Sequence, residues 1–109
     1  MHNHLIEEQL QKKILIIDGA MGTMLQGEDL TADDFGGEEL EGCNENLVLT
    51  RPDILSKIHR QYLEAGADII CTNTFGGTPL VLNEYGLGAK ADEINKRAVQ
   101  LAVEAAEEF

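Results

Sequence analysis

The chain alternates short apolar runs with longer segments in which hydrophobic residues recur every three or four positions. Residues 14–17 (ILII) form a continuous apolar run that stops at Asp18 and Gly19. A second run, residues 67–72 (ADIICT), leads into a polar loop at residues 73–77 (NTFGG). Runs that are this short, rich in branched side chains and bounded by turn residues are typical of strands buried on both faces of a parallel sheet. The pattern therefore predicts two core strands.

Helical spacing predicts four helices, at residues 3–12, 20–27, 50–66 and 91–108. In the third, we expect Thr50 to cap the start and Pro52 to occupy the first turn, where its missing N–H costs nothing. Gly66 is a natural C-terminal stop. The apolar stripe of this helix is expected to be Ile54, Ile58, Tyr62 and Ala65.

Residues 28–46 have a different character, because they are rich in Asp, Glu and Gly. They offer only Leu30, Phe35 and Leu40 for burial. We predict an irregular surface excursion. Loops of this length in a compact domain are often functional.

The order of elements is strand, excursion, helix, strand, helix, which predicts an α/β fold with a parallel sheet. Two strands do not make a self-sufficient sheet of this kind, and a closed barrel needs eight strands and about 250 residues. We therefore expect residues 1–109 to be the opening βα units of a (β/α)₈ TIM barrel, incomplete in this chain. Residues 1–13 would form an N-terminal helix, and residues 14–109 the first two βα units with their excursion.

Acidic residues outnumber basic ones by 20 to 8, which gives a net charge of −12. Nucleic acids and anionic membrane surfaces repel such a chain, so neither is an expected partner. No segment reaches the roughly 20 apolar residues of a membrane span, and no signal peptide is evident. Cys43 and Cys71 lack metal-finger spacing, so we expect two reduced thiols in a cytoplasmic protein, with a disulfide as the open alternative.

Candidate chemistry lies where the predicted strands end, since parallel α/β folds bind ligands at the carboxyl ends of their strands. Asp18 places a carboxylate directly after the first strand, and Gly19 allows a ligand to approach the backbone. The alternative is that Asp18 only caps the following short helix.

Three polar residues, Thr72, Asn73 and Thr74, crowd the end of the second strand, next to Phe75. They could form a ligand-facing loop, or they could simply bond their own backbone in a turn. His59 falls within a predicted helix near its apolar stripe, so we expect a packed or surface histidine. No phosphate-binding loop of the GxGxxG or GxxxxGK[ST] type is present.

Three segments in this order resemble the homocysteine S-methyltransferase domain. They are residues 17–26 (IDGAMGTMLQ), residues 58–70 (IHRQYLEAGADII) and residues 72–75 (TNTF). The resemblance extends over roughly residues 14–108.

Within this family, residues 42–47 (GCNENL) and 49–52 (LTRP) look most like the cobalamin-dependent methionine synthases. Fused methyltransferase–folate reductase proteins share the segment around Asp18 and are a close rival.

The resemblance implies a (β/α)₈ barrel that moves a methyl group onto the thiol of homocysteine. A Zn²⁺ ion held by three cysteines activates the thiol in this family, because the metal favours the nucleophilic thiolate. The resemblance also implies that Asp18 pairs with the amino group of homocysteine and that Gly19 offers backbone contact. Asn73, Thr74 and Phe75 would line the same pocket.

The family's zinc cysteines come from later segments and include an adjacent pair. Neither Cys43 nor Cys71 matches a ligand position, so we assign no metal ligand and no catalytic residue to this chain. Zinc, cobalamin as the methyl carrier, and the cobalamin and folate modules would belong to the intact parent.

We expect the chain alone not to catalyse methyl transfer. The alternative is a non-catalytic chain derived from the same fold, which associates with itself or with a partner through its open sheet edge.

Overall fold

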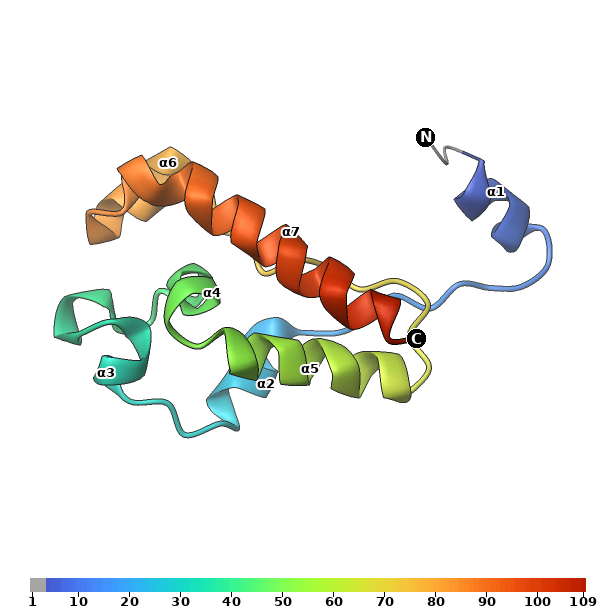
Figure 1. Ribbon diagram of the computed structural model, residues 1–109, viewed down its shortest axis with the longest axis horizontal. Helices are drawn as coiled ribbons and strands as arrows, with labels where there is room; N and C mark the ends of the chain where they lie inside the picture. Colours follow the sequence, from blue (N-terminus) through green and yellow to red (C-terminus); the bar gives the residue numbers. More distant parts are fainter. Residues whose placement is uncertain (1–3) are drawn as a thin grey trace.

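The computed structural model describes residues 4–109, and all regular elements within that range are helices or short helical turns (Figure 1). In chain order they are α1 (Leu5–Leu10), α2 (Met21–Gln26), α3 (Ala32–Phe35), η1 (Glu38–Leu40), η2 (Asn44–Asn46), α4 (Leu47–Thr50), α5 (Pro52–Glu64), α6 (Pro79–Leu82), η3 (Asn83–Tyr85), η4 (Gly88–Lys90) and α7 (Ala91–Glu107). The start of the predicted N-terminal helix, residue 3, lies outside the described residues.

The two longest helices, α5 and α7, confirm the helical periodicity and pack against each other (Figure 1). Ile58 on α5 and Ile94 on α7 are completely buried. The expected cap at Thr50 is wrong, because this residue ends α4 and its hydroxyl donates to the carbonyl oxygen of Asn46 at 3.4 Å. Ala65 is exposed rather than part of the apolar stripe, since it follows the last residue of α5.

The predicted short helix after Gly19 is also present, as α2, and it ends before Gly27 as expected. It buries Leu25 against the core. Within residues 4–109, no helix is long and apolar enough to cross a membrane.

The two predicted strands are reduced to a single parallel bridge between Ile17 and Ile69 in the part of the chain that the structure describes. The backbone N–H of Asp18 donates to the carbonyl oxygen of Ile69 at 2.9 Å, and that of Asp68 to Ile16 at 2.7 Å. The parallel direction is therefore confirmed.

The expected burial of the first segment on both faces is wrong, since Ile14 is 88% exposed, Ile16 58% and Ile17 59%. A strand is buried on both faces only when strands and helices cover it on every side. Within residues 4–109, backbone hydrogen bonds join this segment only to residues 68 and 69.

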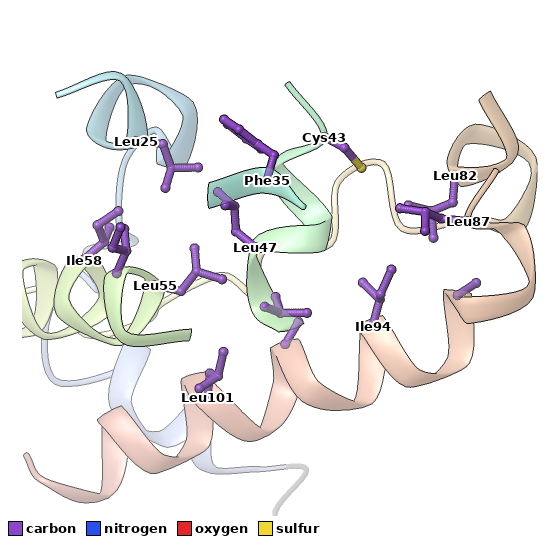
Figure 2. Packing of buried hydrophobic residues seen from close by; sticks show 14 residues of the cluster. Leu25, Phe35, Cys43, Leu47, Leu55, Ile58, Leu82, Leu87, Ile94 and Leu101 are labelled. Carbon is purple, nitrogen blue, oxygen red and sulfur yellow. The ribbon is translucent and has the colours of Figure 1, made fainter. Parts of the chain in front are cut away.

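The excursion at residues 28–46 is more ordered than predicted, because it folds into α3, η1 and η2 and contributes to the core (Figure 2). Phe35 and Cys43 are buried there, whereas Leu30 and Leu40 are only partly covered. The side-chain amide of Asn46 donates to the carbonyl oxygen of Phe35 at 2.8 Å and satisfies the end of α3. The prediction of an irregular surface segment missed this packing.

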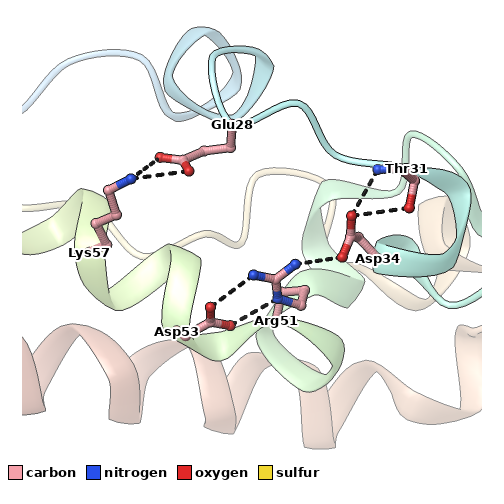
Figure 3. A network of polar contacts seen from close by, with 6 residues as sticks. All are labelled: Glu28, Thr31, Asp34, Arg51, Asp53 and Lys57. Carbon is pink, nitrogen blue, oxygen red and sulfur yellow. Dashed lines mark hydrogen bonds and ion pairs between the residues drawn. The ribbon is translucent and has the colours of Figure 1, made fainter.

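Ion pairs attach the excursion to the start of α5 (Figure 3). The Arg51 guanidinium donates two hydrogen bonds to the Asp53 carboxylate, which is a bidentate contact. It donates a third to Asp34 on α3. Lys57 pairs with Glu28 at 2.9 Å. The excursion is therefore held against α5 at two points.

Candidate functional site

Asp18 lies at the carboxyl end of the first bridged segment, where its half-buried carboxylate contacts the second segment. Its Oδ2 accepts a hydrogen bond from the backbone N–H of Cys71 at 2.9 Å. The alternative role as a helix cap is wrong, because Ala20 is the N-cap of α2 and no side chain caps it. Within residues 4–109, no backbone N–H donates to Oδ1 of Asp18, so this oxygen can accept a hydrogen bond from a ligand.

The five residues predicted to form a site come together around one hollow of about 630 Å³. They are Asp18, Gly19, Asn73, Thr74 and Phe75. Met21 and residues 70–72 complete the lining, and Phe75 is fully exposed at the edge. Residues separated by more than 50 positions therefore share one surface.

Gly19 is closely packed as well as near the hollow. A Cβ atom at this position would lie 3.0 Å from the hydroxyl oxygen of Tyr62. That hydroxyl donates to the carbonyl oxygen of Ala20 at 3.0 Å. Any other residue here would displace the Tyr62 ring slightly, so glycine suits this position independently of any ligand.

The loop at residues 73–77 is held by contacts that the sequence did not reveal. The side chain of Asn73 is only 6% exposed, and its amide donates to the carbonyl oxygen of Asn44 at 2.8 Å. The backbone N–H of Gly76 donates to Oε2 of Glu45 at 3.1 Å. These partners lie about 30 positions away along the chain, so no local pattern marks them.

The hydroxyl groups of Thr72 and Thr74 lie 2.7 Å apart and share a hydrogen bond. The backbone N–H of Thr74 donates to the carbonyl oxygen of Thr72, and that of Gly77 to the carbonyl oxygen of Thr74. The backbone therefore turns here, but the two threonine hydroxyls bond each other rather than their own backbone within residues 4–109, and both residues line the hollow.

The pKa values of Cys71 and His59 are both shifted by burial and by the nearby Asp18 carboxylate. A hydrogen bond to Asp18 and partial burial raise the pKa of the Cys71 thiol, so it stays protonated at neutral pH. His59 is 1% exposed, which confirms that it is a packed histidine. Burial lowers the pKa of His59, while the negative charge of Asp18 partly opposes that shift.

No three His, Cys, Asp or Glu side chains among residues 4–109 converge into a metal-binding arrangement. Both cysteines are free thiols, with Cys43 buried and Cys71 exposed. The residues present here do not fit a zinc site made of three thiolates.

The geometry of the hollow suits a small polar molecule. A carboxylate with one free oxygen can accept a strong hydrogen bond from an ammonium group, and Met21 and Phe75 add apolar surface beside it. The hollow lies at the carboxyl end of a parallel bridge, which is where parallel α/β folds bind ligands.

Comparison with known proteins places the chain within one family. The model described as homocysteine S-methyltransferase matches residues 15–109, and the chain belongs to that family. It is 48% identical over 102 residues to a methionine synthase of Mycobacterium leprae (strain TN), and 48% identical over 100 residues to one of Mycobacterium tuberculosis (strain ATCC 25618 / H37Rv). The resemblance seen in the sequence is confirmed.

These matches cover 94% and 92% of this chain but only 8% of each methionine synthase. A solved structure, the homocysteine methyltransferase MmuM from Escherichia coli in its oxidized form, is similar with a TM-score of 0.74 and 28% identity. The similarity covers 91% of this chain and 32% of that one. The chain thus spans a small part of the length of the relatives it matches.

Proposed function

We propose that the chain forms the first part of a homocysteine-binding (β/α)₈ barrel of the methionine synthase type. In this proposal, Asp18 binds the substrate amino group and Gly19 contributes backbone contact. Asn73, Thr74 and Phe75 shape the same pocket. The observation that carries the proposal is that all five residues surround one hollow at the carboxyl end of the parallel bridge.

The free oxygen of Asp18 is the group on which the proposed binding depends. A carboxylate anchored through Oδ2 to the Cys71 N–H cannot rotate freely, so Oδ1 is already oriented when a ligand arrives. Fixing the acceptor beforehand lowers the entropic cost of binding. Family membership supplies the ligand class, an amino acid with a thiol.

Methyl transfer itself needs groups outside this set. Zinc would supply the activated thiolate, and cobalamin would carry the methyl group, in the larger enzyme. Because the described residues form no such metal site, we assign them substrate binding only. We expect no zinc-dependent turnover of homocysteine by the 109-residue chain.

Substituting Asp18→Asn tests the proposed anchor. The amide keeps an oxygen for the Cys71 N–H but removes the negative charge. A hydrogen bond to a charged group contributes about 1.5–3 kcal/mol, so we expect the dissociation constant for L-homocysteine to rise roughly tenfold or more. Isothermal titration calorimetry under reducing conditions would measure it.

The matched control is Asp33→Asn, which removes the same charge from an exposed position on α3. Its affinity for homocysteine should equal that of the unaltered chain. An unchanged affinity in Asp18→Asn would show that Asp18 only joins the two bridged segments.

A second candidate is a non-catalytic chain that associates with itself or a partner. The exposed isoleucines of the first segment favour it, since unpaired strand edges with apolar side chains attract further strands. A stable monomer at high concentration would count against this alternative.

A further inference from the structure

The excursion contacts the loop at residues 73–77 near both of its ends. At one end, the Asn73 amide donates to the carbonyl oxygen of Asn44 at 2.8 Å. At the other, the Gly76 N–H donates to the Glu45 carboxylate at 3.1 Å. Two adjacent residues of η2 therefore hold two loop residues between which Thr74 and Phe75 lie.

This contact is enclosed and closely packed. Asn73 is 6% exposed, and Gly76 is buried. A Cβ atom at Gly76 would lie 3.2 Å from Oε2 of Glu45 and 3.2 Å from Val81. Because these hydrogen bonds are partly buried, they face weaker competition from water than exposed ones do.

The η2 turn is itself attached to the core. Asn46 is buried and binds the carbonyl oxygen of Phe35, and Leu47 directly after it is completely buried. A contact made by Asn44 and Glu45 is therefore made from a fixed base. The loop at residues 73–77 contains no strand or helix of its own, and its other attachment is at Gly77, whose carbonyl oxygen accepts a hydrogen bond from the Asn95 side chain on α7 at 2.7 Å.

We propose that Asn73 and Glu45 are positioning residues of the homocysteine site. In this arrangement, η2 holds the loop so that Thr74 and Phe75 face the hollow, and the side chain of Asn73 serves the protein rather than the substrate. The consequence for homocysteine rests on the proposed function. The contact itself does not depend on it.

Amide hydrogen exchange at Gly76, followed by NMR on the full chain, tests the contact directly. Glu45→Ala removes the acceptor, so we expect exchange at Gly76 to accelerate roughly tenfold or more. Glu45→Gln keeps an acceptor oxygen and should retain most of the protection. Glu39→Ala, at an exposed position of η1, is the matched control and should leave Gly76 unchanged.

Thermal unfolding of each variant separates a local effect from general destabilisation. Unchanged exchange at Gly76 in Glu45→Ala would overturn the proposal. So would an equal acceleration at amides throughout the chain, because that would indicate loss of the whole fold.

Titration with L-homocysteine then tests the effect on binding. We expect Glu45→Ala to weaken binding about tenfold, and Glu45→Gln to restore most of the affinity. Faster exchange with unchanged affinity would overturn the positioning role. If the unaltered chain binds no homocysteine, the proposed function fails, and exchange at Gly76 still decides whether η2 holds the loop.

Discussion

Among residues 4–109, one buried polar side chain has a ring nitrogen without a hydrogen-bond partner, whereas two buried asparagines are paired. The amides of Asn46 and Asn73 each donate to a backbone carbonyl oxygen. His59 is equally buried, yet its Nδ1 has no hydrogen-bond partner within the described residues. An unsatisfied buried polar atom costs about 1–3 kcal/mol of stability, so His59 is a weak point in an otherwise well-paired core.

Protonation of His59 should destabilise the fold. Burial holds its folded-state pKa below the ordinary value of 6.5, so the unfolded chain binds this proton more readily. The stability that neutral His59 preserves is fully present above about pH 6.5 and is lost as the pH falls through the lower folded-state pKa. We expect the midpoint temperature of thermal unfolding to decrease when the pH is lowered from about 7.5 to about 5.5.

His59→Leu should remove that pH dependence and leave stability at neutral pH equal or higher, since it replaces an unpaired polar group with an apolar one. The carboxylates of Asp34, Asp53 and Asp68 do not confuse the result. Hydrogen bonds and cations hold their pKa values below 3.8, outside this window. If the His59→Leu variant kept the full pH dependence, that dependence would come from a group other than His59.

At the scale of elements, helices were the most predictable feature. The apolar spacing in α5 and α7 repeats over three or more turns, and both helices bury an apolar face. In α5 that face includes Ile54 and Ile58 of the predicted stripe but not Ala65. The two predicted strand segments pair in the expected parallel direction, but only through the single bridge between Ile17 and Ile69. Their burial was predicted wrongly, because burial depends on neighbours that local sequence does not specify.

The excursion shows the same limit. Its helical turns are short and its anchors are long-range, as between Arg51 and Asp34, or between Glu45 and Gly76. For the candidate site, strand-end position was enough to predict that Asp18 and the loop at residues 73–77 lie around one hollow. It could not tell which way the side chain of Asn73 points.

Arg51 offers a test of how the excursion is held. Its planar guanidinium contacts Asp53 through Nε and Nη2, and Asp34 through Nη1 (Figure 3). A lysine ammonium cannot span that geometry. We expect Arg51→Lys to increase proteolytic cleavage within residues 28–46 several-fold while α5 and α7 stay intact, as mass spectrometry of limited digests would show.

Arg60→Lys is the control for Arg51→Lys. Arg60 pairs with Glu108, and that pair joins the ends of α5 and α7 away from the excursion. Equal cleavage of residues 28–46 in both variants would mean that the Arg51 contacts do not hold the excursion.

For the whole molecule, exposed apolar surface and net charge have opposite effects on self-association. The first segment exposes its isoleucines, and α1, which stands apart from the α5–α7 pair in Figure 1, leaves Leu5, Ile6 and Leu10 more than half exposed. Such surface favours association. The net charge of −12 opposes it, but salt at physiological strength screens charges beyond about 8 Å.

We therefore expect the chain to associate at physiological salt. The weight-average mass in sedimentation equilibrium should rise with concentration above the monomer mass of 11.9 kDa. Lysines on the exposed apolar face should prevent this, so Ile14→Lys combined with Ile16→Lys should stay monomeric. These positions lie on the same face of an extended segment and outside the Ile17–Ile69 bridge.

Leu80→Lys with Val99→Lys makes the same charge change at exposed apolar sites elsewhere, and this control should associate like the unaltered chain. If the control were monomeric too, net charge rather than the isoleucine face would govern association. A monomeric unaltered chain would remove the self-associating alternative.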